Sequence, residues 1–482
     1  MHIQHDLLTI PKLQYEKVKS CPHRLTYHAM APYSWINDPN GFVQFRGEYH
    51  LFFQFNPEKP VWGRIHWGHY RSKDMIRWEY LPIALSPEDA YDKDGCFSGT
   101  AIEKDDRLHL CYTGHVVEEG NITQTQCLAT SKDGIIFEKY SENPVLDSPP
   151  EGSNPSDFRD PMVWREGDQY YMVVGSCNPQ KDSGQILLYR SKDLLHWEYM
   201  STTCDQQGSL GYMWECPCIV RLGGRDILIF SPQGIESQGE LYQNNYQSGY
   251  VVGDMDRESG VYQYGDFCEL DRGFDFYAPQ TTMDDKGRCI MIGWMEMWET
   301  EMPTQKNLWA GAMTLPRELA LVNGKIKCYP IKEIEDYRVD PKEITDLDVR
   351  GKLRLDDWSG DTYELYMEIR PKDVKGDVCI ALRASEDEAQ CTRLIYDESL
   401  NRLTLDRRAS GIGPKGQRHI TLDEKPGVLT LRIFVDRSSV EVFVGDGDYV
   451  MTARVYPDPE SVFVDIYGEA RIKTMRQWEI KA

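Results

Sequence analysis

The amino-acid sequence predicts an all-β protein in which a five-bladed β-propeller is followed by a β-sandwich. Two observations support this prediction: a repeat with a period near 60 residues in the first two thirds of the chain, and strands of two-residue periodicity in the last third. The length of 482 residues is ample for two domains. We expect a propeller domain at 1–335 with an N-terminal extension at 1–21, a linker at 336–344, and a sandwich domain at 345–482.

The first repeated phrase is a Ser-Lys-Asp triplet that precedes an aromatic residue and a glutamate. Its copies are Ser72-Lys73-Asp74, Ser131-Lys132-Asp133 and Ser191-Lys192-Asp193, at intervals of 59 and 60 residues. Each copy follows a segment rich in residues that favour strands. A unit that returns at this spacing indicates a repeat architecture.

The second repeated phrase is a short residue pair followed by an apolar strand, a polar turn and another apolar strand. Its five copies begin near Asp38-Pro39, Ser98-Gly99, Asp160-Pro161, Glu215-Cys216 and Ala278-Pro279. The phrase predicts a β-hairpin, and a unit of this length with several short strands is typical of a propeller blade. Five units account for residues 22 to about 335.

Equivalent strands of a propeller begin at the same height around the central channel, so equivalent positions face one another. The repeat places Asp38, Asp160 and Glu215 at equivalent positions in blades one, three and four. We therefore expect three carboxylates to gather around one axis. The alternative is that they cap turns, the commonest role of Asp before Pro. Buried like charges are costly, which favours a functional reason for the trio.

The last third of the chain alternates apolar and polar residues, for example over 429–435 and 440–444. The dipeptide Asp446-Gly447 that follows is a strong hairpin signal. Several such strands predict a β-sandwich, whose expected role is to brace the propeller or to extend substrate contacts.

The composition excludes several classes of partner. A formal net charge of −23 would repel phosphate backbones and anionic lipid headgroups, so we expect neither nucleic acid nor membrane as a partner. A neutral substrate is compatible with this charge, whereas a phosphorylated substrate would need a local cluster of Arg, Lys or His. The sequence leaves the oligomeric state open.

A cytoplasmic location is expected. Met1 to Ser20 has no apolar core of the kind that marks a secretory signal. Thirteen cysteines without a repeating spacing are typical of thiols in a reducing compartment. Cys216-Pro217-Cys218 has no matching ligand pair nearby, so we expect no metal site, and no organic cofactor is implied.

Three motifs carry a family resemblance. Trp35 to Gly41 (WINDPNG), Phe158 to Pro161 (FRDP) and Glu215 to Pro217 (ECP) resemble, in the same order, the signature motifs of glycoside hydrolase family 32. Further segments that are similar to this family are Trp67-Gly68-His69, Gly95 to Gly99, Asp275 to Gln280, Leu315 to Glu318 and Phe434 to Glu441. The resemblance covers nearly the whole chain, and it implies the same propeller and sandwich.

The resemblance also implies an activity and three catalytic roles. It implies hydrolysis of β-fructofuranosidic bonds with retention, through a covalent fructosyl-enzyme. Asp38 is then the nucleophile, Glu215 the general acid and base, and Asp160 the residue that stabilises the transition state.

The other expected pocket residues are less strongly marked. Asn37 and Gln54 are expected to bind furanose hydroxyls, although amides also satisfy buried backbone groups. Trp62 and Trp294 are expected to stack on sugar faces, although tryptophans also fill cores. The remaining expected substrate-binding residues are Phe97, Ser98, Arg159 and Tyr277.

Sucrose and sucrose 6-phosphate are the expected substrates, and four alternatives stay open. A fructan exohydrolase acting on inulin, levan or fructo-oligosaccharides, or a fructosyltransferase, would share the catalytic motifs. An arabinan-type hydrolase also uses a five-bladed propeller with two Asp and one Glu, but the WINDPNG segment and the sandwich argue against it. A non-catalytic carbohydrate-binding propeller would lack one or more of the three acids, and all three are present.

Overall fold

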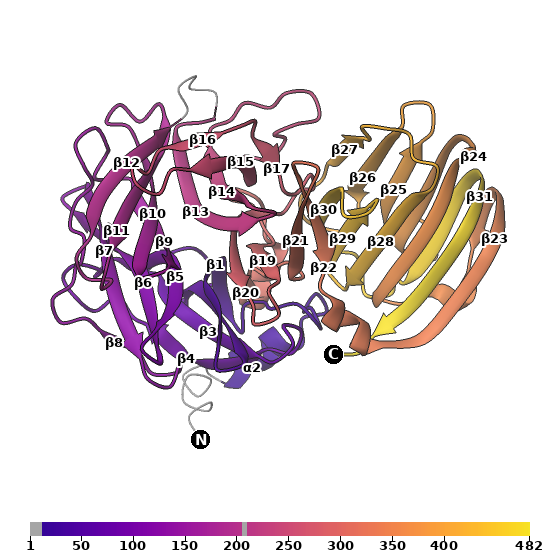
Figure 1. The fold of residues 1–482 in the computed structure, drawn as a ribbon. Coiled ribbons are helices and arrows are strands. Elements are labelled where there is room, and N and C mark those ends of the chain that lie inside the picture. The colour runs from indigo at the N-terminus through magenta and orange to yellow at the C-terminus, as the bar shows by residue number, and fades with distance from the viewer. Residues whose placement is uncertain (1–11, 205–209) are drawn as a thin grey trace.

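The computed structural model describes residues 12–204 and 210–482, which form two β-rich parts (Figure 1). A five-bladed β-propeller is followed by a β-sandwich, so the predicted fold class is confirmed. Within these described ranges the helices are α2 (Lys12–Lys19) and three short 3-10 helices, η1 (Pro303–Asn307), η2 (Lys332–Tyr337) and η3 (Asp356–Trp358). Val18 and Cys21, in the predicted N-terminal extension, are buried in the propeller core.

Each blade is an antiparallel sheet of four or five strands. Blade one contains β1 (Ser34–Phe45), β2 (Glu48–Asn56), β3 (His66–Ser72) and β4 (Glu79–Leu85). Blade two contains β5 (Gly95–Lys104), β6 (Arg107–Glu118), β7 (Asn121–Ser131) and β8 (Glu138–Lys139). Blade three contains β9 (Phe158–Glu166), β10 (Gln169–Cys177), β11 (Gly184–Ser191) and β12 (Glu198–Cys204).

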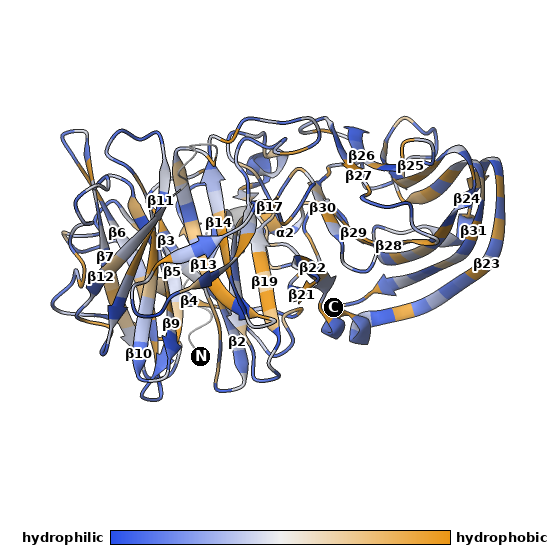
Figure 2. Ribbon diagram, turned by 45° about the horizontal axis from the view of Figure 1, so that its top comes forward, coloured by the Kyte–Doolittle hydropathy of each residue, from blue (hydrophilic) through white to orange (hydrophobic). Residues whose placement is uncertain are grey.

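Blades four and five repeat this plan. Blade four contains β13 (Met213–Leu222), β14 (Arg225–Gln233), β15 (Gly249–Met255), β16 (Tyr262–Tyr264) and β17 (Cys268–Glu269). Blade five contains β18 (Tyr277–Met283), β19 (Cys289–Trp294), β21 (Arg317–Val322) and β22 (Lys325–Pro330). Along its whole length β19 is buried, and it is mostly orange in the hydropathy view (Figure 2).

The ring closes through the first strand of each blade. Each first strand contacts the first strand of the next blade, and β18 contacts β1. In addition β20 (Trp309–Ala310), from the segment between β19 and β21, pairs in parallel with the start of β1. The last blade is therefore tied to the first by backbone hydrogen bonds as well as by packing.

The Ser-Lys-Asp phrase builds the same turn in three blades, between the third and fourth strands. Ser72 Oγ accepts a hydrogen bond from the amide three residues later, and Asp74 Oδ1 accepts from the amides two and three residues later. The same bonds recur at Ser131 and Asp133, and at Ser191 and Asp193. Short polar side chains that satisfy turn amides explain why this phrase repeats.

Two layers of the sandwich share its long strands. The strands are β23 (Arg338–Arg354), β24 (Thr362–Ala384), β25 (Cys391–Asp397), β26 (Arg402–Ala409), β27 (Gln417–Thr421), β28 (Leu429–Asp436), β29 (Ser439–Val444), β30 (Tyr449–Arg454) and β31 (Phe463–Ile480). The first half of β24 pairs with β28 and its second half with β25, while β31 follows β24 throughout. The stretch expected as a linker, 336–344, holds the end of η2 and the start of β23, because β23 extends to pair with the end of β31.

Buried charges fill the seam between propeller and sandwich. Arg317 of blade five forms ion pairs with Asp271 at 3.0 Å and with Glu441 of the sandwich at 2.7 Å, and all three side chains are fully buried. His28 lies between Asp436 and Glu441, with its two ring nitrogens 2.8 and 2.9 Å from their oxygens. A buried charge is tolerated only when it is paired, so these contacts fix how the two parts dock.

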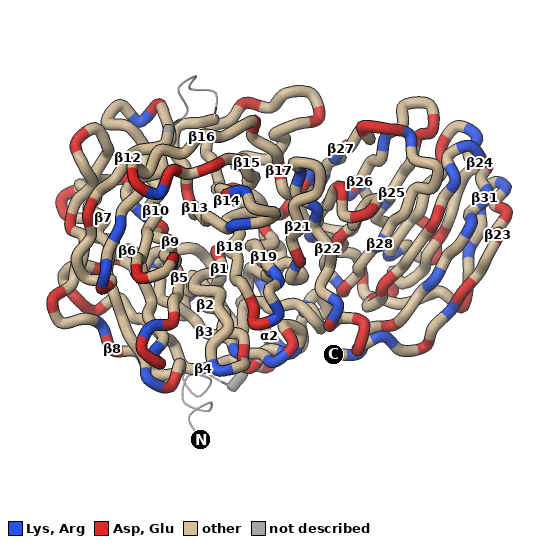
Figure 3. Tube along the Cα trace, in the orientation of Figure 1, with Lys and Arg blue, Asp and Glu red and all other residues tan. Residues whose placement is uncertain are grey.

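Acidic and basic residues are both spread over the propeller and the sandwich (Figure 3). None of the helices that the structure describes is long and apolar enough to cross a membrane.

We expect the stability of the fold to decrease at alkaline pH through His28. Burial by itself lowers the pKa of His28, but hydrogen bonds to Asp436 and Glu441 outweigh it and raise the pKa from 6.5 to about 9. Protonated His28 therefore stabilises the folded state fully below pH 6.5, and this contribution is lost as the pH rises through about 9. Thermal unfolding from pH 6 to 10 should show a steeper loss for the wild type than for His28→Gln. Parallel curves for the two proteins would contradict this assignment.

Candidate active site

The five inner strands share a kink at the same place. In each inner hairpin the pairing register shifts beside the phrase that the repeat identified. Asp160, Cys216 and Ala278 have left-handed backbone there, with φ of 65°, 49° and 49°, and a proline follows each of them. Non-glycine residues with such φ values cost roughly 1–3 kcal/mol each and cluster at functional sites. An extra residue in a strand also redirects the neighbouring side chains.

Blade two has Gly99 where the other blades have proline. A Cβ at Gly99 would lie 2.0 Å from the carbonyl oxygen of Cys111 on the paired strand, so only glycine fits.

The kink corrects the expected equivalence of the three acids. When the blades are aligned on Pro39, Pro161 and Pro217, Asp38 and Asp160 are equivalent to Cys216. Glu215 lies one residue earlier, at the position of Asn37, Phe97, Arg159 and Tyr277 in the other blades. The prediction of three equivalent positions was therefore wrong by one residue for Glu215. Because adjacent strand residues point in different directions, Glu215 approaches the site differently from the two aspartates.

The two aspartates are buried and share a thiol. Cys216 donates from its backbone amide to Asp160 Oδ2 at 3.0 Å, and its Sγ lies 3.6 Å from that oxygen and 3.7 Å from Asp38 Oδ2. Ser98 Oγ donates to Asp38 Oδ2 at 3.0 Å, and Thr113 Oγ1 accepts from the amide of Asp160. Among the residues that the structure describes, Asp38 Oδ1 has no hydrogen-bond partner.

The electrostatics of the two aspartates follow from this crowding. Burial, followed by the negative charges of Glu215 and Asp160, raises the pKa of Asp38 from 3.8 to about 7. Burial and the charge of Glu215 also raise the pKa of Asp160, while Arg159 opposes the shift. Two buried carboxyl groups and a third nearby resist simultaneous ionisation.

Glu215 has a contrasting environment. Arg159 donates two hydrogen bonds to Glu215 Oε1, at 2.9 Å from Nε and 2.8 Å from Nη2. Gln233 Nε2 and the Tyr277 hydroxyl donate to Oε2 at 2.8 and 2.6 Å. Both oxygens are thus fixed in orientation, although 15% of the side chain remains exposed.

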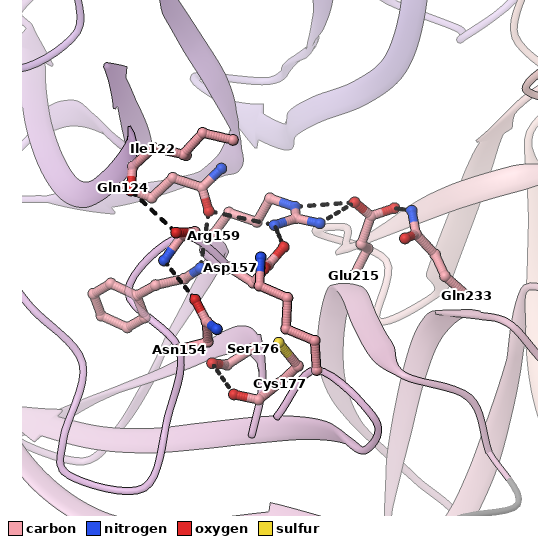
Figure 4. Close-up of polar contacts among 12 residues, drawn as sticks. Ile122, Gln124, Asn154, Asp157, Arg159, Ser176, Cys177, Glu215 and Gln233 are labelled. Atoms are coloured by element: carbon pink, nitrogen blue, oxygen red, sulfur yellow. Dashed lines mark hydrogen bonds and ion pairs between the residues drawn. The ribbon is translucent and has the colours of Figure 1, made fainter. Parts of the chain in front are cut away.

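Figure 4 shows Arg159 at the centre of a polar network. Its Nη1 donates to Asp157 Oδ1 at 2.8 Å and to Gln124 Oε1 at 3.3 Å, while the other side of the guanidinium faces Glu215. Asp157 is also paired with Lys181 at 2.7 Å. Because its guanidinium is hydrogen-bonded along both edges, Arg159 holds the Glu215 carboxylate rigidly.

The remaining predicted residues divide into three groups. Asn37 and Gln54 are both buried. Asn37 Oδ1 accepts a hydrogen bond from Trp35 Nε1, and Gln54 Nε2 donates one to the carbonyl of Cys96. Phe97 stacks on His115 with ring centroids 4.0 Å apart. Trp62 is 51% exposed and meets Phe97 edge to face, so these two rings form an accessible aromatic wall.

Trp294 was expected to stack on a sugar face, but its side chain is enclosed by other residues. It is 0% exposed and packs against Trp35 and Trp298, with ring centroids 5.9 and 4.8 Å away. Trp294 pairs with Tyr277 across the hairpin, which turns its indole into the core between blades.

Five residues that bond to the three acids or to Arg159 were not predicted from the sequence. They are Thr113, Cys216, Gln233, Gln124 and Asp157. The repeat contained a signal for Gln233, because it ends the nine-residue second strand of its blade as Asn56 does in blade one. Both Gln124 and Asp157 lie outside the repeated phrase. Only tertiary structure brings Gln124 to Arg159, from 35 positions away, whereas Asp157 precedes Arg159 by two residues.

Comparison with known proteins agrees with this geometry. The family description "Glycosyl hydrolases family 32 N-terminal domain" matches residues 28–330, and "Glycosyl hydrolases family 32 C terminal" matches residues 333–479. A sucrose-6-phosphate hydrolase of Escherichia coli is 42% identical over 95% of this chain and 94% of its own length. A raffinose invertase of Escherichia coli is 40% identical over 92% of this chain and 91% of its own length.

Solved structures are similar along the whole chain as well. The sucrose-6-phosphate hydrolase from Lactobacillus gasseri has a TM-score of 0.88 and 29% identity, covering 99% of this chain and 96% of that one. A mutant Bombyx mori GH32 β-fructofuranosidase in complex with sucrose has a TM-score of 0.85 and 35% identity, covering 98% and 97%. The chain is a glycoside hydrolase and belongs to glycosyl hydrolase family 32.

Proposed function

We propose that the chain is a retaining β-fructofuranosidase that hydrolyses the terminal β-D-fructofuranosyl bond of sucrose or sucrose 6-phosphate. The observation that supports this most is a pair of unlike carboxylates, one desolvated with a free oxygen at Asp38 and one fixed by donors at Glu215. Retaining hydrolysis needs a carboxylate nucleophile and a second carboxyl group that exchanges protons, about 5 to 5.5 Å apart.

Asp38 is the nucleophile in this mechanism. Its Oδ2 is held by Ser98, whereas Oδ1 has no partner among the described residues and is available to attack C2 of the fructosyl unit. Poor solvation makes the ionised carboxylate more reactive toward carbon.

Glu215 first protonates the departing oxygen of the leaving group. As a carboxylate it then takes a proton from the water that hydrolyses the fructosyl-enzyme. Arg159, Tyr277 and Gln233 hold its two oxygens for both steps. Asp160 binds sugar hydroxyls and stabilises the oxocarbenium-like transition state by its negative charge.

The named relatives support the choice of substrate. Sucrose-6-phosphate hydrolases and a raffinose invertase are 40–42% identical to this chain over more than nine tenths of its length. Sucrose, sucrose 6-phosphate and raffinose each end in a fructosyl unit, and they differ in the group that leaves. We also propose a cytoplasmic location, supported by the twelve cysteines whose side chains the structure describes, none of which forms a disulfide.

Replacing either catalytic carboxylate by its amide should remove most of the activity. We expect Asp38→Asn to lower kcat on sucrose by at least roughly 10⁴-fold, because an amide cannot form the covalent intermediate. Glu215→Gln should lower kcat by about 10²- to 10⁴-fold, which is the usual contribution of general acid catalysis. Unfolding temperatures of the variants show whether the fold is kept. Full activity of purified Glu215→Gln would contradict the proposal.

The acid limb of the pH profile should follow Asp38. Since attack requires the ionised carboxylate and its pKa is raised to about 7, kcat/KM should decrease as the pH falls through this region. Ser98 donates to Asp38 Oδ2 and so favours the ionised form. Ser98→Ala should therefore move the acid limb to higher pH. If the acid limb of Ser98→Ala stays at the wild-type pH, the limb does not report the ionisation of Asp38.

The leaving group can be identified by direct competition of substrates. We expect kcat/KM for sucrose or sucrose 6-phosphate to exceed that for a kestose and for inulin, in assays of released fructose. A preference for inulin over sucrose would overturn the substrate choice and leave the catalytic roles untouched.

A further inference from the structure

We infer that Asp275 is a positioning residue through which the sandwich sets the place of Tyr277, and thereby the orientation of Glu215. The inference rests on the proposed role of Glu215 as general acid. It concerns the segment 271–277, which leads from the seam into the active site.

The first part of this segment lies along the sandwich. Strand β30 ends the hydrogen-bonded order of its sheet, and Figure 1 shows it on the side that faces the propeller. The amide of Arg272 donates to the carbonyl of Val450 at 2.8 Å, and that of Phe274 to the carbonyl of Thr452 at 2.7 Å. A Cβ at Gly273 would lie 2.1 Å from the nitrogen of Thr452, so the approach requires glycine.

The Asp275 carboxylate then locks into the sandwich. Its Oδ2 accepts from Arg407 Nη1 at 2.6 Å and from the amide of Arg454 at 2.7 Å, and its side chain is 1% exposed. The guanidinium of Arg407 also lies 4.0 Å from the centroid of the Phe274 ring. Charge-assisted bonds without competing water hold this point more firmly than packing does.

The second strand of the same hairpin is held in the same way. Tyr277 pairs with Trp294, and Glu296 follows two residues later. Glu296 Oε1 accepts from Arg454 Nη1 at 2.6 Å, with both side chains almost completely buried. Both strands are thus anchored to sandwich arginines two residues away from the Tyr277–Trp294 pair.

Tyr277 transmits this anchorage to the active site. Its ring is 0% exposed, and its hydroxyl donates to Glu215 Oε2 at 2.6 Å. A hydrogen bond weakens steeply with distance and angle, so a small displacement of Tyr277 would release one oxygen of Glu215. The Asp275 carboxylate itself bonds to Arg407 and Arg454 and not to Glu215, which makes its role one of positioning.

The test compares two leaving groups. Glucose needs a proton from the general acid, whereas p-nitrophenolate leaves without one. We expect Asp275→Asn to lower kcat/KM on sucrose about ten-fold more than kcat/KM on p-nitrophenyl β-D-fructofuranoside, the scale of one lost charge-assisted bond. The ratio kcat/KM is used because it covers only the steps up to formation of the fructosyl-enzyme, where the two leaving groups differ. A purely structural role would lower both rates by the same factor.

Two further variants link the effect to Tyr277. Tyr277→Phe should show the same selective loss, and the double variant should lose no more than either single variant, because both act on one bond. Arg407→Lys keeps a cation beside Asp275, so it serves as the second variant if Asp275→Asn does not fold. It should show the same selective loss on sucrose, with a smaller fold-change. Glu364→Gln is the matched control, a fully buried carboxylate paired with Arg338 and Arg432. It should keep the wild-type ratio of the two rates.

The outcomes separate this inference from the proposed function. If Glu215→Gln is selective for the leaving group but Asp275→Asn and Arg407→Lys keep the wild-type ratio, the inference fails and the catalytic roles stay. Additive losses in the double variant would also overturn it. If Glu215→Gln itself shows no selectivity, the proposed general acid is wrong and the inference fails with it.

Discussion

In all five blades the inner strand carries an extra residue beside a proline or glycine, and the geometry of the whole site depends on this kink. It brings Asp38, Asp160 and Cys216 to equivalent places around the channel, and leaves Glu215 one residue earlier. Strand bulges redirect side chains at a cost in backbone energy that a large, well-paired sheet can sustain. The five-fold repeat therefore supplies both the convergence of the acids and the difference between them.

The active site and the seam differ in how their buried charges are paired. Inside the pocket, three carboxylates face one arginine, and burial followed by the charges of Glu215 and Asp160 raises the pKa of Asp38. At the seam the balance is reversed, because each buried acid has an arginine or a protonated histidine beside it. Paired buried charges hold the propeller and the sandwich together rigidly, whereas buried carboxylates that lack a paired cation have the shifted pKa values typical of catalytic groups. The segment 271–277 connects the two regions.

The amount that the sequence predicted differs between residues for physical reasons. The turn at Ser72 and Asp74 and the hairpins were predictable, because local hydrogen bonds and strand periodicity decide them. The register of Glu215 was missed by one residue, because a bulge leaves no mark in the apolar pattern. Trp294 was expected to stack on a sugar face, but its burial depends on tertiary packing, here against Trp35 and Trp298.

By itself the sequence determined the five-fold repeat, the sandwich that follows it, and the identity of the three acids that meet at the channel. These properties are local or periodic, so they are written in residue order and spacing. Only the tertiary structure decided which donors hold Glu215, how Arg159 is shared with Asp157 and Gln124, and how Asp275 reaches Arg407 in the sandwich. Apart from the local bond between Arg159 and Asp157, those contacts join residues from 18 to 132 positions apart, and no local pattern specifies a partner at such a distance.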